Sequence, residues 1–503
     1  MPSPGLPGVL RWRAAHHPDQ VALAVPGVGS LTFAAWEHRS RRVAVGLVDL
    51  GMRPGDRVGL IFSAEDWVDY AVACLAVQRA GAVAVPLSDR LAPPQIQYRL
   101  THCGAALAVH GPGTRQRPDL TARLVPLDLV EAPHGPDVVE PDVVEPSLGH
   151  RGSDPAQILY TSGTTRAPRA VTATHDNLVA GFRADVRRMP FGHSAALVHA
   201  FAIGTNAAQT MLGHALTARP TVLTPTRPTP NRFARLIESA GACTVFLVPS
   251  TAIELLRSGA LAGRDLTGVQ LVGCTAAALP PAVALELANT FPHAAIVNYY
   301  TSTEAAPAVA SMIFDPARPD CVGRAAPGSL RICDSEARVV PAGTVGDVWL
   351  RAPHARSYLD DPDADQATFG GDGWVRMGDL GRLDPDGYLY LVGREDDVVK
   401  SGAFKVSTLE VESALFTLPT VADAAVVALP HPVLGAVLGA VVVPRDGATT
   451  EITLPAIRGA LLGLLSDHEL PACLAVVDRL PRNDGGKVVK HELPRLFATT
   501  TGP

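Results

Sequence analysis

Hydroxyl side chains surround a single glycine in the segment from Gln157 to Val171, which reads QILYTSGTTRAPRAV. The hydroxyl-rich turn consists of Thr161, Ser162, Gly163, Thr164 and Thr165. Hydroxyls and backbone N–H groups of such a turn can bind one anion, and glycine lets the backbone approach it closely. Arg166 and Arg169 add positive charge. The segment lacks the P-loop spacing, and taken alone it could also be a Ser/Thr turn that binds no ligand.

Later segments also carry groups suited to nucleotide chemistry. They are 298–304 (NYYTSTE), 377–380 (MGDL), 393–402 (GREDDVVKSG) and 480–488 (LPRNDGGKV). Taken singly, each has a structural explanation. Asp379 could cap a Gly-Asp turn, and Glu304 could be a solvated acid near a helix start. Tyr300 could be a core aromatic, and Lys487 an exposed lysine in a Gly-Gly turn.

Together, these segments resemble in order and spacing the motifs of the adenylate-forming superfamily. That superfamily contains acyl-CoA synthetases, adenylation domains of nonribosomal peptide synthetases and beetle luciferases. YTSGTTRAPRAV resembles its phosphate-binding signature, NYYTSTE its Tyr-Gly-x-Thr-Glu element and MGDL its Thr-Gly-Asp element. GREDD resembles its hinge region, and the segment around Lys487 its C-terminal lysine loop. The resemblance covers nearly the whole chain.

The resemblance implies that ATP, Mg²⁺ and a small-molecule carboxylic acid meet in one site. The hydroxyl-rich turn and Arg169 would hold the phosphates, and Thr303 would bond the α-phosphate. Glu304 would hold Mg²⁺, which typically binds phosphate oxygens and one or two carboxylates. Because both reactants are anions, charge neutralisation and alignment dominate the barrier. Lys487 would bridge the carboxylate and the α-phosphate, a role that suits a compact charge on a flexible stem.

The nucleoside would be held by a second group of residues that the resemblance implies. Asp379 would accept both ribose hydroxyls with help from Arg394, and Tyr300 would stack on the adenine. Further nucleotide contacts would come from Thr275, Ala276, Asn298, Tyr299 and Thr301. Asp396 falls at the hinge position, where rotation of a small domain would withdraw Lys487 and open a thiol channel.

The chain departs from the superfamily pattern at several glycines. Arg166 and Ala170 replace glycines of the phosphate signature, and Thr301 replaces the glycine of the Tyr-Gly-x-Thr-Glu element. Arg169 replaces a lysine, but it keeps the charge and can bind phosphate bidentately. These changes affect the expected loop mobility and nucleotide geometry rather than the motif assignment.

The segment 197–204 (LVHAFAIG) bears on the acid. Peptide-synthetase domains for α-amino acids carry a Phe-Asp pair there, whereas Ala202 follows Phe201 in this chain. We therefore expect an aliphatic or aromatic acid without an α-ammonium group. His199 resembles the pocket-side histidine of acyl- and aryl-CoA synthetases and is a catalytic candidate, although a core histidine fits equally well. The predicted acyl pocket consists of His199, Phe201, Gly273 and Cys274.

The resemblance implies transfer of the acyl group to a thiol. Coenzyme A is the first expectation. The alternative is the phosphopantetheine of a separate carrier protein, because the sequence contains no carrier segment of its own. Adenylation with a non-thiol acceptor, and a catalytically impaired homologue, stay open as further alternatives.

Strand-like and helical patterns alternate early in the chain, as at 31–50, 57–62, 66–81 and 82–87. Such alternation favours crossover units and parallel sheets. From residue 328, short strands such as RVVPAG (338–343) favour a β-rich region. We expect a multi-domain α/β protein with a large N-terminal domain (1–395) that contains two parallel-sheet subdomains. A β-rich subdomain would lie at about 320–395, and a small mobile domain would span 396–503.

Composition narrows the functional class. The chain has 503 residues, of which 47% are hydrophobic and 18% charged, so global disorder is excluded. A formal net charge of −6 and few aromatic residues argue against nucleic-acid binding. The apolar stretch 421–444 contains Pro430 and Pro432, which favours two strands over a membrane span. Scattered cysteines without a CxxC pair favour a reduced, cytoplasmic protein.

Overall fold

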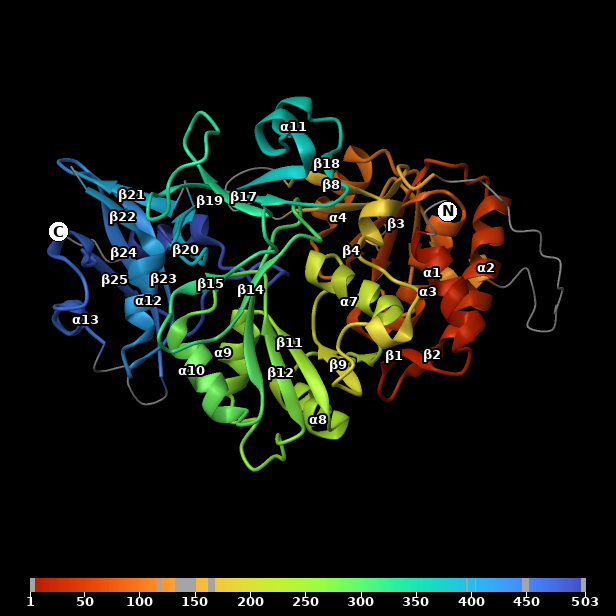
Figure 1. Ribbon diagram of the computed structural model, residues 1–503, viewed down its shortest axis with the longest axis horizontal. Coiled ribbons are helices and arrows are strands. Elements are labelled where there is room, and N and C mark those ends of the chain that lie inside the picture. Colours follow the sequence, from red (N-terminus) through yellow and green to blue (C-terminus); the bar gives the residue numbers. More distant parts are fainter. Residues whose placement is uncertain are drawn as a thin grey trace.

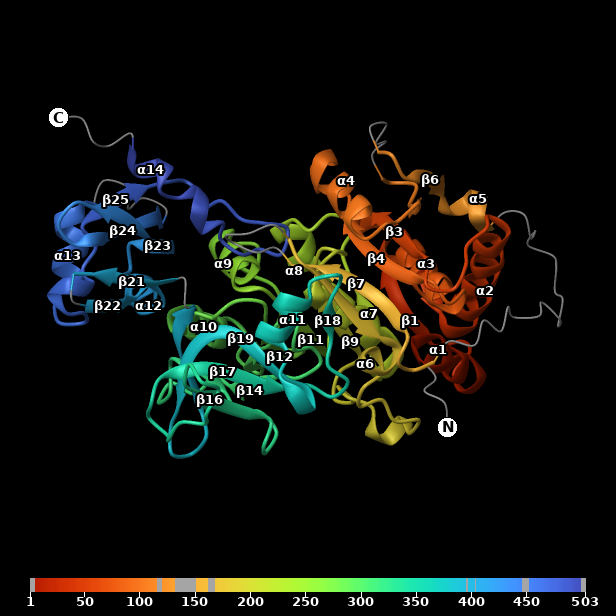
Figure 2. The same cartoon turned by 90° about the horizontal axis from the view of Figure 1, so that it is seen from above.

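The computed structural model describes residues 5–114, 120–131, 151–161, 168–394, 397–402, 404–445 and 452–498. The N-terminal sheets fill the right and centre of Figure 1, and the C-terminal domain, in blue, lies at the left. Figure 2 shows the same separation from above. The protein therefore has a large N-terminal part and a small C-terminal domain, as the sequence predicts.

The first sheet has the strand order β18-β8-β7-β4-β3-β5-β6. Its strands are β3 (Arg57–Phe62), β4 (Val83–Ser88), β5 (Leu107–His110), β6 (Arg123–Pro126), β7 (Pro155–Tyr160), β8 (Ala170–Thr174) and β18 (Ser357–Tyr358). The central strands are parallel, whereas β8 and β18 are antiparallel. Every residue of β4 is buried, as expected for a parallel sheet that is covered on both faces. The prediction of strands at 57–62 and 82–87 is confirmed.

The second sheet has the order β14-β13-β12-β11-β9-β10-β1-β2. Its strands are β1 (Val21–Val25), β2 (Gly29–Thr32), β9 (Ala196–His199), β10 (Thr221–Leu223), β11 (Cys243–Leu247), β12 (Val269–Cys274), β13 (Ala295–Tyr300) and β14 (Ala310–Ile313). Strands β9 to β13 and β1 run parallel, and β2 and β14 are antiparallel edges.

Helices divide the N-terminal part into layers. A shared apolar core lies between the two sheets and includes α1 (Gly5–His16), α2 (Phe33–Asp49), α3 (Trp67–Arg79) and α7 (Asn206–Thr217). The helix α4 (Pro93–His102) covers the far face of the first sheet. The outer face of the second sheet is covered by α8 (Pro230–Ala240), α9 (Pro249–Arg257) and α10 (Pro281–Thr290). Shorter helices are α5 (Leu127–Glu131), α6 (His175–Leu178) and α11 (Pro362–Thr368).

An antiparallel sheet forms the predicted β-rich region, in the order β15-β20-β19-β17-β16. Its strands are β15 (Cys321–Gly323), β16 (Leu330–Cys333), β17 (Gly346–Arg351), β19 (Trp374–Leu383) and β20 (Leu389–Arg394). The strand predicted at 338–343 is wrong, because only an isolated bridge joins Val339 to Cys333. Pro341 has no N–H for a ladder, and Val339 is 65% exposed, so this segment has little to pair with or bury.

The C-terminal domain contains the hairpin of β21 (Val398–Ser401) and β22 (Phe404–Ser407) and the sheet of β23 (Val421–His431), β24 (Gly435–Pro444) and β25 (Cys473–Val476). Its helices are α12 (Thr408–Phe416), α13 (Leu454–Leu461) and α14 (Arg495–Ala498). The stretch 421–444 forms two strands, as predicted. Among the described residues, we find no helix with the length and apolar character needed to cross a membrane.

Candidate active site

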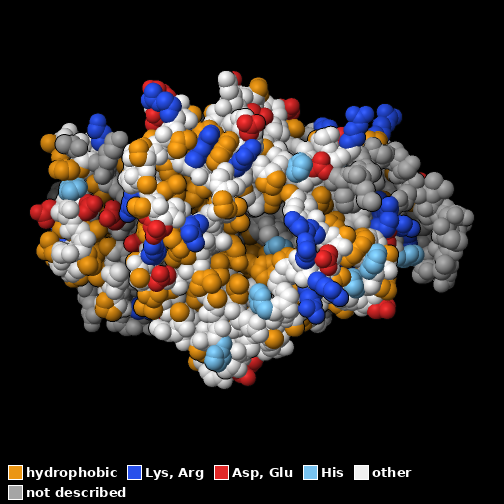
Figure 3. Space-filling view, in the orientation of Figure 1, with side chains coloured by type: hydrophobic (Ala, Val, Ile, Leu, Met, Phe, Trp, Pro, Cys, Tyr) orange, Lys and Arg blue, Asp and Glu red, His pale blue; other side chains and the backbone are white. Residues whose placement is uncertain are grey.

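Parallel neighbours of the second sheet end at one edge. β9 ends at His199, β11 at Leu247, β12 at Cys274 and β13 at Tyr300. Open α/β sheets bind ligands in the crevice outside the carboxyl ends of their strands. The front face of the molecule is hollowed near its centre, between α7 and β11, and hydrophobic side chains line this hollow (Figure 3).

Three predicted nucleoside residues meet beside this edge. The Tyr300 hydroxyl donates to Asp379 Oδ2 at 2.6 Å, and Arg394 Nε lies 3.3 Å from Asp379 Oδ1. Asp379 and Arg394 face each other across β19 and β20, so Asp379 lies inside a strand and does not cap a turn. Burial raises the pKa of Asp379, although Arg394 and Tyr300 act in the opposite direction. Burial and Asp379 together raise the pKa of Tyr300 well above its usual value, so this hydroxyl stays protonated and donates.

Lys487 reaches the same place from the C-terminal domain. Burial and then Arg394 lower the pKa of Lys487, while Asp379 and Glu304 act to raise it. The amine thus lies in the electrostatic field of residues on β19, on β20 and in the segment after β13. In Figures 1 and 2, a blue segment of the C-terminal domain extends toward the centre of the molecule. Lys487, Asp379, Arg394 and Glu304 therefore lie within electrostatic reach of one another, and their roles in the site stay a prediction.

A tight turn presents the lysine. Lys487 N donates to Asn483 Oδ1 at 3.0 Å, and Asn483 N donates to the Lys487 carbonyl at 2.9 Å. Gly486 has a φ of +78°, and a Cβ built on it would lie 2.5 Å from Ser250 Oγ and 2.9 Å from Val248 Cγ2. The turn therefore packs directly on the junction of β11 and α9, where only glycine fits.

Side chains that the sequence did not single out brace the segment carrying Thr303 and Glu304. Arg356 Nη1 donates to the Thr303 carbonyl at 2.8 Å and to Asn206 Oδ1 at 3.1 Å. Arg356 Nε donates to Asn177 Oδ1 at 3.0 Å. The Asn177 amide in turn donates to the carbonyl of Ala306 at 3.0 Å. Arg356 is buried, and burial lowers its pKa to about 10, so it remains charged at neutral pH.

Tyr358 connects two of the predicted phosphate-site residues. Its hydroxyl donates to Glu304 Oε1 at 3.1 Å, and the Arg169 guanidinium lies 5.1 Å from its ring centroid. Burial, with Glu304, raises the pKa of Tyr358 to about 12. Arg169 also lies 3.9 Å from Asp361 Oδ2. Arg169 and Glu304 thus lie on two sides of one tyrosine.

The hydroxyl-rich turn is described only at its margins. Thr161 N donates to the Arg169 carbonyl at 2.9 Å, which closes the base of the turn. The predicted phosphate contacts Ser162, Gly163, Thr164 and Thr165 lie outside the described residues, as does Arg166. The predicted hinge residue Asp396 also lies outside them.

His199 is fully buried at the end of β9. Its Nδ1 accepts from Phe201 N at 3.1 Å, and its ring stacks on Phe201 and meets Trp67 edge-on at 5.0 Å. Its Nε2 has no hydrogen-bond partner among the described residues. Burial lowers the pKa of His199 to about 3, so the ring is neutral at physiological pH. These are the contacts of a packed neutral ring, and the catalytic role of His199 stays a prediction.

The last two residues of β12, Gly273 and Cys274, face opposite sides of the sheet. Gly273 lies under the rings of Phe246 and Tyr299, and a Cβ built on it would lie 2.9 Å from each. Cys274 points to the opposite face, where it packs in the core under α8 to α10, and burial raises its pKa to about 12. The structure therefore brings Gly273, but not Cys274, to these aromatic rings.

The next residues, predicted to contact the nucleotide, follow the same edge. Thr275 N donates to the Leu247 carbonyl at 3.1 Å, and Ala276 has a φ of +75°. Asn298 lies opposite Cys274 in the ladder. The Thr301 hydroxyl donates to the Ala308 carbonyl at 2.7 Å. This threonine, which replaces a glycine of the motif, thus closes the turn after β13.

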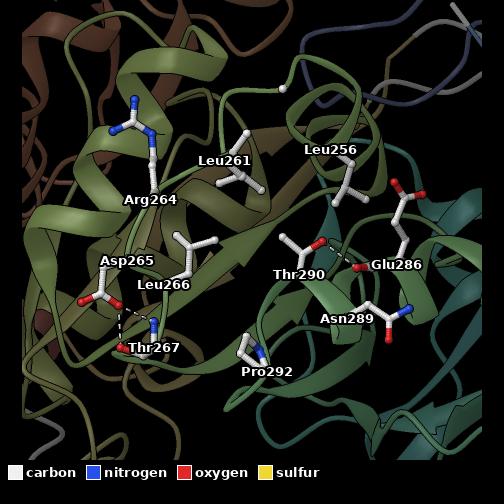
Figure 4. A pocket seen from close by; sticks show the side chains of 12 residues that line it. Leu256, Leu261, Arg264, Asp265, Leu266, Thr267, Glu286, Asn289, Thr290 and Pro292 are labelled. Carbon is white, nitrogen blue, oxygen red and sulfur yellow. Dashed lines mark hydrogen bonds between the residues drawn. The ribbon is translucent and has the colours of Figure 1, made fainter.

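A separate pocket of about 470 Å³ lies between α10 and the loop after α9 (Figure 4). Leu256, Leu261 and Leu266 form its apolar side, and Glu286 and Asn289 belong to α10. None of the predicted site residues lines it.

Sequence reasoning missed Arg356, Asn177 and Tyr358. Each is a single polar or aromatic residue in an otherwise ordinary segment, and its role depends on contacts between distant parts of the chain. Only the resemblance could have directed attention to their neighbour Glu304, and it assigned no role to the three residues themselves.

Two family models and a curated relative match most of this chain. Residues 10–359 match the model of the AMP-binding enzyme family, and residues 410–487 match that of the AMP-binding enzyme C-terminal domain. The chain is 30% identical to a feruloyl-CoA synthase from Amycolatopsis sp over 500 residues, which cover 96% of this chain and 97% of that protein.

Solved structures share the fold. ATP-bound MatB from Rhodopseudomonas palustris superposes with a TM-score of 0.83 at 28% identity, covering 97% of this chain and 99% of that one. The amide bond synthetase McbA from Marinactinospora thermotolerans gives a TM-score of 0.81 at 26% identity, with 98% and 100% coverage. The chain therefore belongs to the AMP-binding enzymes of the adenylate-forming superfamily, and it is an AMP-forming ligase.

Proposed function

We propose that this protein joins a carboxylic acid to AMP, releases pyrophosphate, and then transfers the acyl group to coenzyme A. The observation that carries the proposal is the position of Lys487 in the field of Asp379 and Glu304. Lys487 is half-buried near two carboxylates of the large domain, and no hydrogen bond or ion pair within the described residues holds its amine, which suits a site where two anionic substrates meet.

In the first step, a carboxylate oxygen of the acid attacks the α-phosphorus of ATP and the bond to pyrophosphate breaks. Lys487 supplies positive charge between the two anions, and Arg169 supplies it at the departing phosphates. In this proposal, Thr303 bonds the α-phosphate, and the hydrogen bond from Arg356 to its carbonyl supports that role. Asp379 and Arg394 hold the ribose, a role supported by their pairing.

The donor set is compatible with Mg²⁺ that is bound together with ATP. Among the described residues, we find no group of three or more His, Cys, Asp or Glu side chains that could hold a metal. Glu304 offers one carboxylate, which fits a cation that takes its other ligands from phosphates and water. Bound Mg²⁺ would neutralise phosphate charge.

In the second step, the thiolate attacks the acyl carbonyl, the bond to AMP breaks, and the thiol proton is released to solvent. We infer that the C-terminal domain rotates at Asp396 between the steps, so that Lys487 leaves and the thiol enters. A cytoplasmic location, where coenzyme A is available, fits seven cysteines that are all unpaired.

Coenzyme A as the acceptor is supported by similarity to proteins that are named as CoA ligases or synthases, including the feruloyl-CoA synthase. A carrier-protein thiol is the alternative, because both thiols end in phosphopantetheine. The similarity to an amide bond synthetase favours one further candidate, an amine acceptor. All three share the adenylation step.

Exchange of labelled pyrophosphate into ATP, measured over a panel of carboxylic acids, tests adenylation directly. We expect acid-dependent exchange, and Lys487→Ala should slow it by roughly 10²–10³, the usual effect of removing one electrostatic donor. The matched control is Arg479→Ala, which removes an exposed cation of the same domain. Addition of coenzyme A, a carrier protein or an amine then identifies the acceptor from the product.

A finding of acid-dependent exchange that is unchanged in Lys487→Ala would contradict the role of the lysine. Absence of exchange with every acid would contradict the proposed function as a whole.

A further inference from the structure

Four aromatic side chains meet on the face of the second sheet that looks toward α7. The ring centroid of Phe246, on β11, lies 5.6 Å from that of Phe191, 6.3 Å from that of His214 and 6.0 Å from that of Tyr299. Phe191 and His214 also meet edge-on at 5.2 Å. We call Phe191, His214, Phe246 and Tyr299 the aromatic cluster.

The aromatic cluster lies beside the residues that would hold the nucleotide. Successive residues of a strand point to opposite faces. Tyr300 contacts Asp379 on one side of β13, whereas Tyr299 packs over Gly273 and Phe246 on the other. The cluster therefore begins one residue away from the predicted adenine contact.

Helix α7 connects the cluster to the lysine turn. A Cβ built on Gly485 would lie 3.9 Å from Thr205, the residue that caps the start of α7. His214 follows Thr205 by nine residues, or about 13 Å along the helix at 1.5 Å per residue. An acid with its carboxylate near Lys487 could thus extend along α7 and place a ring among these side chains.

The cluster borders open space rather than forming a closed core. Phe191, His214 and Tyr299 are each only partly buried, whereas Phe246 is buried. Phe191 has a φ of +59°, a costly conformation for a bulky residue, and such strain persists mainly at functional sites.

The four rings themselves are uncharged, and His193 lies edge-on to Phe191 at 6.1 Å. Within the described chain, no hydrogen bond or ion pair joins a Lys, Arg, Asp or Glu side chain to any of the four rings. The pKa of His214 falls to about 4 through burial alone, so its ring is neutral. Arg219 approaches the adjoining Gly192, but it is an exposed side chain. A second carboxylate or an ammonium group would find no counter-ion among the rings.

We propose that the acid activated by this protein is an aromatic monocarboxylate, whose ring is bound by the aromatic cluster of Phe191, His214, Phe246 and Tyr299. Aromatic rings gain from edge-to-face and offset contacts beyond the area they bury. Phe246 and Tyr299 also lie directly over Gly273. These two rings therefore occupy the space beside the sheet that a long, flexible acyl chain would need. This inference rests on the proposed adenylation and specifies its substrate class.

Pyrophosphate exchange with four classes of acid tests the proposal. The panel is benzoate, 4-hydroxybenzoate and cinnamate; hexanoate and octanoate; malonate; and phenylalanine. We expect kcat/KM for the best aromatic monocarboxylate to exceed that for each other class by about 10-fold or more, which is the scale of pocket discrimination. A straight-chain acid, malonate or phenylalanine that equals or exceeds the aromatic acids would overturn the proposal while leaving adenylation intact. Absence of exchange with every acid of the panel would overturn both this proposal and the proposed adenylation.

Phe246→Leu tests the cluster itself, because it keeps an apolar side chain and removes the ring that contacts the other three. We expect KM for the best aromatic acid to rise about 10-fold, with KM for ATP and exchange with hexanoate changed much less. The control is Tyr388→Leu, whose ring lies beside Arg318 and Arg324 in the β-rich sheet. Equal losses for aromatic and straight-chain acids in Phe246→Leu, with a normal melting temperature, would overturn the assignment of this ring.

Discussion

At the scale of single residues, Arg356 shows how a side chain that need not touch substrate can shape the site. Its guanidinium joins Asn177, Asn206 and the Thr303 carbonyl, which belong to three separate parts of the chain. A planar guanidinium spreads its donors over Nε and Nη1 in a fixed fork that reaches all three acceptors, whereas an ammonium group places its three donors on one atom. We therefore regard Arg356 as a positioning residue for Thr303 and Glu304.

Replacement of Arg356 tests this role. Arg356→Ala should lower the kcat of pyrophosphate exchange by about 10- to 100-fold, because a displacement near 1 Å can cost that much. Arg356→Lys should recover only part of the loss. We also expect both variants to need more Mg²⁺ for half-maximal rate, since Glu304 lies on the braced segment. Kinetics at varied Mg²⁺ and ATP would measure these effects.

The matched control is Arg351→Ala, which removes an exposed arginine that donates to the carbonyl of Asp372 at 2.8 Å. If Arg356→Ala folds normally and behaves like Arg351→Ala in exchange and in Mg²⁺ dependence, Arg356 does not position the site.

The environment of Lys487 predicts a pH dependence with a definite sign. Because burial lowers the pKa of this amine from 10.5, its charge is lost at a lower pH than that of an exposed lysine. The kcat/KM for ATP reports the free enzyme, so it should fall on the alkaline side with a midpoint below 10.5. Arginine stays charged, so Lys487→Arg should lose this limb. An unchanged alkaline limb in that variant would assign it to another group.

Folding stability should respond to the same titration in the opposite direction. Between the folded and unfolded pKa values of Lys487, the unfolded chain binds more protons, so the free energy of unfolding rises with pH. The cost of burying the charged amine applies below the folded pKa and is relieved above it. Keeping Lys487 charged in the site therefore lowers the free energy of unfolding.

At the scale of elements, the turn 483–487 is the feature that places the lysine. Gly486 combines a φ of +78° with close contacts to Ser250 and Val248. A side chain at this position would strain the backbone and also push the turn away from the end of β11. The turn therefore needs glycine for two separable reasons.

Gly486→Ala and Gly463→Ala form a pair that separates these reasons. Gly463, in the same domain, has a φ of +92°, but a Cβ built on it would meet no atom within 4 Å. Both variants should lose about 1–2 kcal/mol of unfolding free energy from backbone strain. Only Gly486→Ala should also slow pyrophosphate exchange, by about 10-fold or more. Equal exchange rates in the two variants would show that contact with the large domain does not matter.

Helices and strands with clear periodicity were predictable. The helical pattern at 31–50 and the apolar run at 57–62 became α2 and β3, because their spacing records which face is buried. The helix α13 ends at Leu461, although apolar residues continue beyond it, since Leu462 has an extended ψ of 126° and Gly463 a positive φ. Helix ends of this kind depend on local backbone geometry that periodicity does not specify.

The site was predictable where a motif names a residue and unpredictable where tertiary contact creates the role. The motifs directed attention to Asp379, Arg394, Glu304 and Lys487, which lie within electrostatic reach of one another. The aromatic cluster instead collects residues from four distant segments. No sequence spacing relates Phe191 to Tyr299, so only the folded chain shows that they share one face.

At the scale of the whole molecule, a partly buried ionic network joins the start of the C-terminal domain to the segment that carries Lys487. Lys490 Nζ lies 2.9 Å from Glu412 Oε1 and 3.6 Å from Asp397 Oδ2, and it donates to Thr408 at 3.1 Å. Asp397 directly follows the predicted hinge residue, and Lys490 follows Lys487 by three positions. The segment that leaves the hinge and the segment that carries the lysine are thus fixed to each other.

Contacts across the domain boundary hold Lys487 in the site in this arrangement. Arg445 lies 3.5 Å from Glu286 of α10, and Ser413 donates to Asp320 at 3.2 Å. These two polar contacts are partly exposed, and each contributes little free energy. Apolar side chains of both domains also belong to one buried cluster, which includes Leu415 of the C-terminal domain and Leu287 of α10. The docked arrangement is therefore stabilised mainly by apolar packing.

The central claim is that one bound nucleotide contacts both the large domain and Lys487. A crystal structure with a nonhydrolysable ATP analogue and Mg²⁺ tests it most directly. We predict the adenine beside Tyr300, the ribose hydroxyls at Asp379, the metal at Glu304, and the Lys487 amine in contact with the α-phosphate. A nucleotide bound elsewhere, or bound here with Asp379 and Glu304 untouched, would contradict the account.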